Sequence, residues 1–265
     1  MLAAPCTALM AAVGEESDRD VYGFWEKSPN FVRMKNLNVH VVDMPDFETY
    51  FAYYFPPGFE AQPVKRAVVA VHGTDGTPYA EIQDEQKMAD RLGYAVIAIQ
   101  MRVPNGKSGL MPPRKLYGLI DQSVNYLRQT YGFDLTRLAY VGFSVGGAKS
   151  FQIAYYDRLS PRPLFSLIVN HSGLSKPETS FLRESQQRGL AKPFAGLPFA
   201  LYCGMEDEEW GNQQCSDMED WKNRLAELGA PQIFAIHDDE GGHGGYRKNP
   251  AHHEKVMRWF VELTP

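Results

Sequence analysis

The chain has 265 residues, of which 44% are hydrophobic and 22% are charged, and these proportions exclude a disordered, collagen-like or coiled-coil protein. Its formal net charge is −5, so it lacks the excess of positive charge that attracts nucleic acid over long range. No apolar run reaches the roughly 18 residues that a transmembrane helix needs. We therefore expect neither a nucleic-acid partner nor a membrane span.

The first twenty residues differ in character from the rest of the chain, and we expect a tail or a signal-like segment over residues 1–20. Leu2–Val13 is almost wholly apolar, and Ala12-Val13-Gly14 has the small-x-small form of a signal-peptidase site. No Lys or Arg precedes the run, so an N-terminal helix or a disordered tail is the alternative. The pattern favours a secreted or periplasmic location over a cytoplasmic one. Residues 21–265 are expected to form a single domain.

The predicted elements begin with an antiparallel hairpin over residues 37–55, whose two β-rich stretches are joined at Pro45-Asp46. Buried strands and amphipathic helices then alternate along the chain. The predicted strands are Arg66–His72, Tyr94–Ile99, Leu138–Phe143, Leu164–Val169, Leu197–Cys203 and Gln232–His237, and the predicted helices are Tyr79–Leu92, Leu116–Tyr131, Val145–Tyr156, Cys215–Leu228 and Pro250–Leu263.

This alternation predicts the fold class. Consecutive parallel strands need a crossover, which is usually a helix, so we expect an α/β protein with a mostly parallel sheet of about eight strands and helices on both faces. The segment between the strands that begin at Leu164 and Leu197 is short, which predicts a small cap or none.

Ser144 lies in the motif Gly-Phe-Ser-Val-Gly, residues 142–146, between a predicted strand and a predicted helix. Such a turn is typical of a nucleophile elbow, in which a strained serine presents its hydroxyl and flanking glycines let the turn close. The alternative is a serine that caps the helix N-terminus.

A serine nucleophile needs a base, and an acid that orients that base. The acid is expected after the strand Leu197–Cys203, where Asp207 is our choice. Glu206 and Glu208 are close competitors, and the run could instead be a solvated acidic loop.

The base is expected after the last predicted strand. His243 lies there in Glu-Gly-Gly-His-Gly-Gly, residues 240–245, and the glycines would allow its loop to reach the serine. The competing histidines are His237 at the strand end, and His252 and His253 in the last helix.

The reaction also needs donors for the oxyanion. The N–H of Val145 follows the nucleophile at a helix start, and a second donor is expected in the turn His72-Gly73-Thr74. The N–H of Thr74 is preferred, with Gly73 as the alternative. His171 and Trp210 follow other strands on the same side and are candidate substrate-binding wall residues.

The sequence predicts no cofactor and no metal site. Asp238, Asp239 and the histidines near them match no dedicated metal spacing. Cys203 and Cys215 lie twelve residues apart, so they could form a disulfide, or Cys203 could be a buried free thiol.

These motifs together resemble the serine hydrolases of the α/β-hydrolase fold, from about residue 37 to the C-terminus. The stretch YGLIDQSVNYLRQTYGFDLTRLAYVGFSVGGAKS, residues 117–150, is similar to the esterase branch that includes polyhydroxybutyrate depolymerases and feruloyl esterases. The resemblance implies a catalytic triad of Ser144, Asp207 and His243 and an oxyanion hole at Thr74 and Val145.

The expected activity is hydrolysis of carboxylic esters through an acyl-serine intermediate, on a small-molecule or polymeric ester. A non-catalytic protein that binds a small ligand in the same fold and an amide or peptide hydrolase with the same triad are the alternatives. The oligomeric state is left open.

Overall fold

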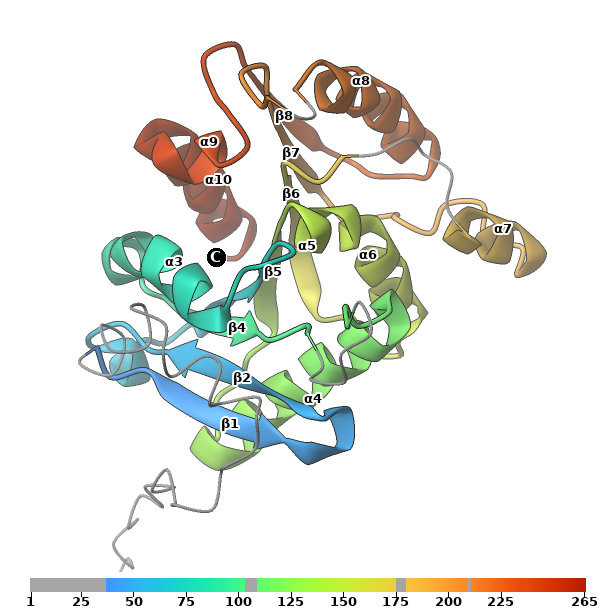
Figure 1. Cartoon of the computed structure of the whole chain (residues 1–265). Helices are drawn as coiled ribbons and strands as arrows, with labels where there is room; N and C mark the ends of the chain where they lie inside the picture. Colours follow the sequence, from blue (N-terminus) through green and yellow to red (C-terminus); the bar gives the residue numbers. More distant parts are fainter. Residues whose placement is uncertain (1–36, 103–108, 175–179, 209–210) are drawn as a thin grey trace, which may run out of the picture.

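The computed structural model describes residues 37–265 except 103–108, 175–179 and 209–210 (Figure 1). The predicted tail or signal-like segment, residues 1–20, lies outside the described residues, and so does Trp210. Within the described part of the chain, no helix is both long and apolar enough to span a membrane.

The described strands form one sheet of eight in the order β1-β2-β4-β3-β5-β6-β7-β8. β1 and β2 form the predicted antiparallel hairpin, and β2 pairs antiparallel with β4. The remaining neighbours pair in parallel, as predicted. The strands are β1 His40–Met44, β2 Thr49–Tyr54, β3 Arg66–Val71, β4 Tyr94–Ile99, β5 Arg137–Phe143, β6 Phe165–His171, β7 Phe199–Gly204 and β8 Ile233–Asp238.

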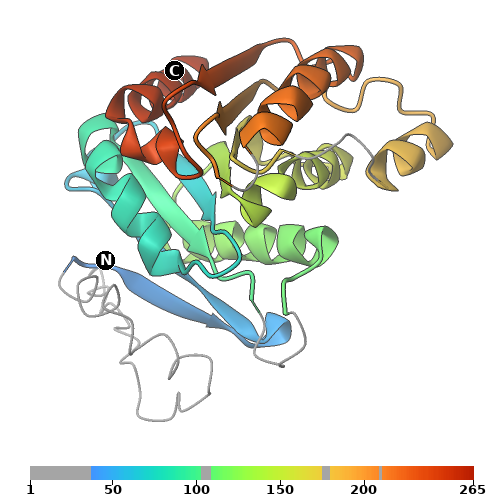
Figure 2. The ribbon, with the colours of Figure 1, turned by 45° about the horizontal axis from the view of Figure 1, so that its top comes forward.

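Helices cover both faces of the sheet, with α3, α9 and α10 on one side and α4, α6, α7 and α8 on the other (Figures 1 and 2). The helices are α3 Pro78–Leu92, α4 Pro113–Tyr131, α5 Val145–Ala148, α6 Ser150–Leu159, α7 Ser180–Gln187, α8 Gly211–Glu227, α9 Gly245–Lys248 and α10 Pro250–Leu263, with the short 3-10 helices η1 Pro45–Phe47 and η2 Phe59–Ala61. Among the described residues, the insertion between β6 and β7 contains only α7, as expected for a small cap.

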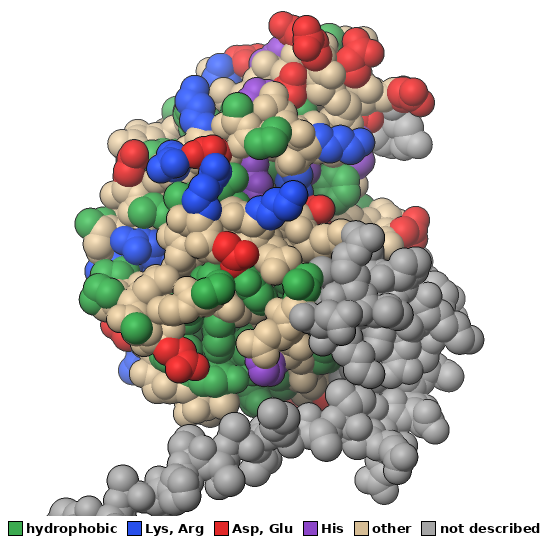
Figure 3. Space-filling model, turned by 90° about the vertical axis from the view of Figure 1, so that its left-hand side faces the viewer, with side chains coloured by type: hydrophobic (Ala, Val, Ile, Leu, Met, Phe, Trp, Pro, Cys, Tyr) green, Lys and Arg blue, Asp and Glu red, His purple; other side chains and the backbone are tan. Residues whose placement is uncertain are grey.

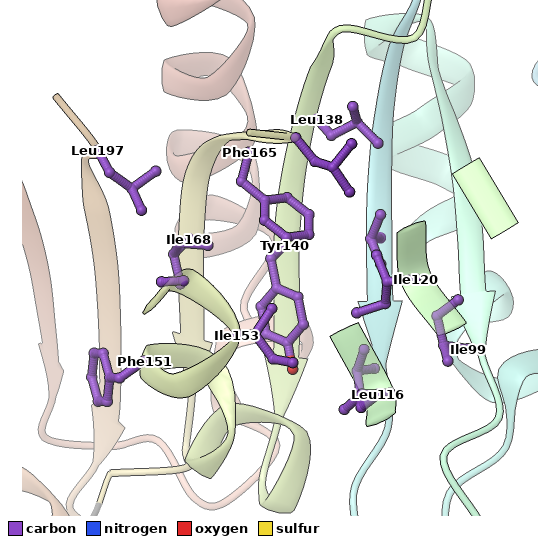
Figure 4. Packing of buried hydrophobic residues seen from close by; sticks show 14 of the residues in the cluster. Ile99, Leu116, Ile120, Leu138, Tyr140, Phe151, Ile153, Phe165, Ile168 and Leu197 are labelled. Carbon is purple, nitrogen blue, oxygen red and sulfur yellow. The ribbon is translucent and has the colours of Figure 1, made fainter. Parts of the chain in front are cut away.

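The parallel strands are buried on both faces because their apolar residues form continuous runs. Along β3, Val69 and Val71 belong to the hydrophobic cluster under α4, α6 and α8, and Val68 and Ala70 belong to the cluster under α3 and α10. Figure 4 shows the first cluster, where Tyr140 of β5 and side chains of α4 and α6 fill the space beside the sheet. This packing fixes the strand ends from which the candidate site is built.

The predicted helix Val145–Tyr156 is divided in the structure into α5 and α6 at Lys149. The amide of Asn170 in β6 donates to the carbonyl of Gly147 at 2.8 Å and to Oγ of Ser150 at 3.0 Å. The sequence could not predict this break, because Asn170 comes from another strand.

Candidate active site

The three residues predicted as nucleophile, acid and base all follow carboxyl ends of parallel strands. Ser144 follows β5, Asp207 follows β7 and His243 follows β8. Because β5, β6, β7 and β8 are consecutive neighbours, these ends lie along one edge of the sheet, where α/β proteins bind ligands.

Ser144 has a strained backbone, with φ of 52° and ψ of −116°. Its N–H donates to the carbonyl of His171 at 2.9 Å, and its own carbonyl accepts from the N–H of Ala148 at 2.8 Å. These bonds hold the residue in a conformation that non-glycine residues seldom adopt. Its side chain makes no capping hydrogen bond, which argues against the helix-cap alternative.

Glycines around Ser144 are required by close backbone packing. A Cβ on Gly142 would lie 2.4 Å from the carbonyl oxygen of Gly146, and a Cβ on Gly146 would lie 2.2 Å from that of Val71. A Cβ on Gly173 would lie 2.3 Å from the carbonyl oxygen of Ser144. The tight turn therefore depends on glycine on both sides of the serine.

His243 and Asp207 are hydrogen bonded, although 36 residues separate them in sequence. Nδ1 of His243 donates to Oδ2 of Asp207 at 2.6 Å. The acid side chain is 5% exposed and the imidazole is 37% exposed, so the carboxylate lies behind the ring. The ring centroids of His243 and Phe143, the residue before Ser144, lie 5.0 Å apart. The pair therefore lies beside the turn that carries the serine.

The loops that carry Asp207 and His243, the predicted acid and base, contact each other through their backbones. The N–H of Glu206 donates to the carbonyl of Gly241 at 2.9 Å, and a Cβ on Gly204 would lie 2.2 Å from that oxygen. The glycines flanking His243 do not have positive φ. Gly241 in the same loop allows close approach, since a Cβ on it would lie 2.2 Å from the side-chain oxygens of Asp238 and Tyr202.

Gln214 is a contact of Asp207, the predicted acid, that sequence reasoning missed. Its Nε2 donates to Oδ2 of Asp207 at 3.3 Å, on the oxygen that His243 also contacts, and its side chain is buried. No local signal marks this glutamine, because its role depends on how α8 packs. The competitors Glu206 and Glu208 are exposed, which favours Asp207 as the acid.

The predicted oxyanion turn lies against the serine. A Cβ on Gly73 would lie 3.0 Å from Cβ of Ser144. Thr74 is exposed in this turn, and Val145 is the first residue of α5, where an N–H has no acceptor within the helix. His72 donates through Nδ1 to the carbonyl of Gly73 at 2.6 Å, and burial lowers its pKa, so a neutral ring supports the turn.

The structure corrects the expectation for His171 as a substrate-binding wall residue. Its side chain is 1% exposed and packs against Phe143, Tyr202 and Tyr246, because β6 turns it toward the face that α9 covers. It lies behind the site and has no surface open to a ligand. Trp210, the other wall residue, stays a prediction because it lies outside the described residues.

Cys203 and Cys215 form a disulfide, with 5.2 Å between their Cα atoms. It joins the end of β7 to the fifth residue of α8 and closes the segment that contains Asp207. His237 lies near both sulfurs, and these are the described side chains whose donor atoms lie close enough to share a metal ion. In the disulfide form the two sulfurs are not available as thiolates.

Comparisons with known proteins identify the fold. No protein-family model matches the chain, and no curated protein sequence matches it. A fungal esterase from Rhizomucor miehei superposes with a TM-score of 0.64 at 15% identity, over 93% of this chain and 90% of the esterase. An S-formylglutathione hydrolase from Agrobacterium tumefaciens gives 0.60 at 16% identity over 86% and 95%, and a Bacillus cereus carboxylesterase gives 0.55 at 15% over 89% and 100%.

Proposed function

We propose that this chain, which has the α/β-hydrolase fold, is a serine hydrolase that cleaves carboxylic esters through an acyl-serine intermediate. Ser144 is the nucleophile, His243 the general base and Asp207 the acid that orients the base. The observation that carries this proposal is the hydrogen bond between His243 and Asp207 beside a serine with positive φ.

In the first half of the reaction, Oγ of Ser144 attacks the ester carbonyl carbon while Nε2 of His243 takes the hydroxyl proton. The Nδ1–H bond to Asp207 leaves Nε2 as the basic nitrogen and stabilises the imidazolium that forms. The N–H groups of Val145 and Thr74 donate to the oxyanion. When the tetrahedral intermediate collapses, His243 returns the proton to the departing alcohol, and Ser144 remains acylated.

In the second half, water attacks the acyl carbon while His243 takes one of its protons. Collapse of this intermediate releases the carboxylic acid, and the proton returns from His243 to Oγ of Ser144. The chain is thus regenerated without a cofactor. The small insertion between β6 and β7 supports short esters, aryl esters or an exposed polymer chain as substrates. Long-chain esters, which lipases with a large lid cleave, are less favoured.

The test compares turnover of p-nitrophenyl acetate and butyrate by the wild-type chain and by Ser144→Ala. We expect the variant to lose about 10⁴- to 10⁶-fold in kcat. A fluorophosphonate should label the wild-type chain once and leave the variant unlabelled. Full turnover by Ser144→Ala would exclude Ser144 as the nucleophile. A wild-type Ser144 that the fluorophosphonate does not label would favour the ligand-binding alternative.

The substrate class is tested with a panel of acyl chain lengths, aryl esters, a polyester and matched anilides. Preference for aryl esters or polyester would support the resemblance to the feruloyl esterase and polyhydroxybutyrate depolymerase branch, which stays a prediction. Anilide cleavage at a rate similar to that of the matched esters would favour the amide-hydrolase alternative.

A further inference from the structure

Arg247 lies in the short helix α9, four residues after His243, and its side chain is only 7% exposed. Its Nη2 donates to Oε2 of Glu81 at 2.5 Å, and its Nη1 donates to Oδ2 of Asp84 at 3.2 Å. Both acids belong to α3. One guanidinium therefore joins the segment after the predicted base to two residues of a helix that lie 166 and 163 positions earlier in the chain.

The ion pairs continue into a buried cluster. Glu85 of α3 is fully buried, and its Oε2 accepts from Nε2 of His253 at 3.0 Å and from the hydroxyl of Tyr94 at 2.9 Å. Burial acts to raise the pKa of Glu85, but His253, Arg247 and Tyr94 outweigh burial and lower it to about 2. Glu85 is therefore a charged carboxylate, and its negative charge further stabilises the guanidinium of Arg247.

The α3 end of this cluster is tied to the predicted oxyanion turn. Thr77 caps α3, its side chain accepting from the N–H of Ala80 at 3.2 Å and its carbonyl from that of Glu81 at 3.2 Å. Glu81 is also near enough to His72, at the start of the turn, to raise the pKa of that ring against the effect of burial. The N–H of Gly76 donates to the carbonyl of Gly73 at 3.3 Å, so the backbone runs from the turn to the cap of α3 as one hydrogen-bonded segment.

The α9 end is tied to the predicted base. The N–H of Gly245 donates to the carbonyl of Gly242 at 2.9 Å, so the backbone around His243 leads into α9 as one hydrogen-bonded segment. His171, behind the site, is within electrostatic range of both Arg247 and His243. Arg247 therefore lies between the loop of the base and the helix that follows the oxyanion turn.

We propose that Arg247 is a positioning residue. Through its ion pairs with Glu81 and Asp84, it keeps His243 at a fixed distance and orientation from the oxyanion turn. This inference rests on the proposed function, because it assigns those two segments their roles. Arg247 does not touch the reacting atoms. It acts through the loop 240–245, whose displacement by a fraction of an ångström would move the imidazole away from Ser144.

A second ion pair of α3, with α10 instead of α9, supplies a matched control. Arg91 of α3 pairs with Glu254 of α10 at 2.7 Å, and these side chains are 49% and 27% exposed. Figure 3 shows the face over α3, α9 and α10, where Lys and Arg side chains lie among Asp and Glu side chains. A partly exposed pair of this kind contributes little to stability, so Arg91→Met should leave catalysis unchanged.

The test measures the rate and the final extent of fluorophosphonate labelling, together with kcat and KM for p-nitrophenyl butyrate, in Arg247→Met, Arg247→Lys and Arg91→Met. We expect Arg247→Met to lower the labelling rate and kcat by about 10- to 100-fold, with KM within about twofold of wild type and labelling still complete. Arg247→Lys keeps the charge and should recover most of the rate. Complete labelling shows that the molecules are folded, so a slower rate reports position.

The inference is overturned if Arg247→Met labels at the wild-type rate, if only its labelled fraction falls, or if Arg91→Met slows labelling equally. Should Arg247→Met fail to fold, Glu81→Gln decides instead, because it removes one charge and keeps an acceptor for Arg247. A slower rate with complete labelling supports the inference, and the wild-type rate overturns it. Failure of the proposed function is distinguished by a wild-type chain that is itself neither labelled nor active.

Discussion

The hydroxyl of Tyr202 donates to Oδ2 of Asp238 at 2.9 Å and joins the carboxyl ends of β7 and β8 beside the loop that carries His243. A Cβ on Gly241 would lie 2.2 Å from both of these oxygens, and a Cβ on Gly245 would lie 1.9 Å from the hydroxyl. Gly241 and Gly245, each two residues from His243, therefore rest directly on this hydrogen-bonded pair. Their lack of a side chain lets the loop that carries the imidazole lie close against the ends of β7 and β8.

Gly245→Ala should displace the loop, because its methyl group cannot share the space of the Tyr202 hydroxyl. We expect kcat/KM to fall by at least about tenfold and stability to fall by about 1–3 kcal/mol. Ester turnover and urea unfolding measure the two effects. The control is Gly118→Ala in α4, where a Cβ would make ordinary contacts at 3.6 Å and should stabilise the helix. Adding Tyr202→Phe to Gly245→Ala should restore part of the activity, and no restoration would contradict this explanation.

Asp207→Asn should lower kcat by about 10³- to 10⁴-fold, because an amide favours the wrong tautomer of His243. KM should change little, since the acid lies behind the imidazole and not against the substrate. The matched controls are Glu206→Gln and Glu208→Gln, which alter exposed side chains of the same loop. A larger loss in either control than in Asp207→Asn would reassign the acid.

Loss of the disulfide should weaken both the fold and the site. Cys203→Ala/Cys215→Ala removes a cross-link between residues twelve apart, which costs about 3 kcal/mol in the loop-entropy description. Turnover should also fall, because Asp207 and Gln214 lie inside the closed loop. Urea unfolding with and without dithiothreitol provides the measurement. Reductant should destabilise the wild-type chain and leave the double variant unchanged, and an equal response of both proteins would exclude a role for this bridge.

His171→Phe should make the protein less sensitive to acid. Burial lowers the pKa of His171 well below its ordinary value, with smaller contributions from Arg247, His243 and His253. The unfolded chain takes up a proton near pH 6.5 that the folded chain resists, so this residue reduces stability as the pH falls below about 6.5. No hydrogen bond of ordinary geometry reaches either ring nitrogen among the described residues, and a weak interaction with the backbone of His243 is the polar contact that phenylalanine would remove.

The measurement for His171→Phe is the melting temperature at pH 8 and at pH 5. The advantage of the variant over the wild type should be larger at pH 5, and ester turnover at pH 8 should stay within about threefold because the ring lies behind the site. A variant that loses stability equally at both pH values would show that His171 is not a buried neutral ring. A large rise in KM alone would instead support His171 as a substrate-binding residue.

Much of the fold could be predicted from local patterns. Strands buried on both faces have continuous apolar runs, and helices commonly end just before a glycine. β4 has the predicted bounds, and α3 ends before Gly93, which has a φ of 75°. The strained turn at Ser144 was also predictable, because Gly142 and Gly146 mark it in the sequence. These features depend on neighbours in the chain.

The rest depends on contacts between distant segments, which no local pattern encodes. Asn170 of the neighbouring strand β6 bonds to the predicted helix where that helix divides, and Gln214 reaches Asp207 only because α8 packs beside the loop that carries Asp207. Arg247 has no motif around it that marks a buried ion pair with α3. His171 was misjudged because the end of a strand does not reveal which face a neighbouring helix covers. The roles of Ser144, Asp207 and His243 stay predictions until activity is measured.

The glycines at positions 142, 146, 173 and 204 face main-chain oxygens at hypothetical Cβ distances of 2.2 to 2.4 Å. In a directed-evolution library, random codons at these four positions would therefore yield mostly inactive clones, whatever substrate is used for selection. Substitutions are better introduced at partly exposed residues such as Phe143 and Val145, because these side chains contact other side chains.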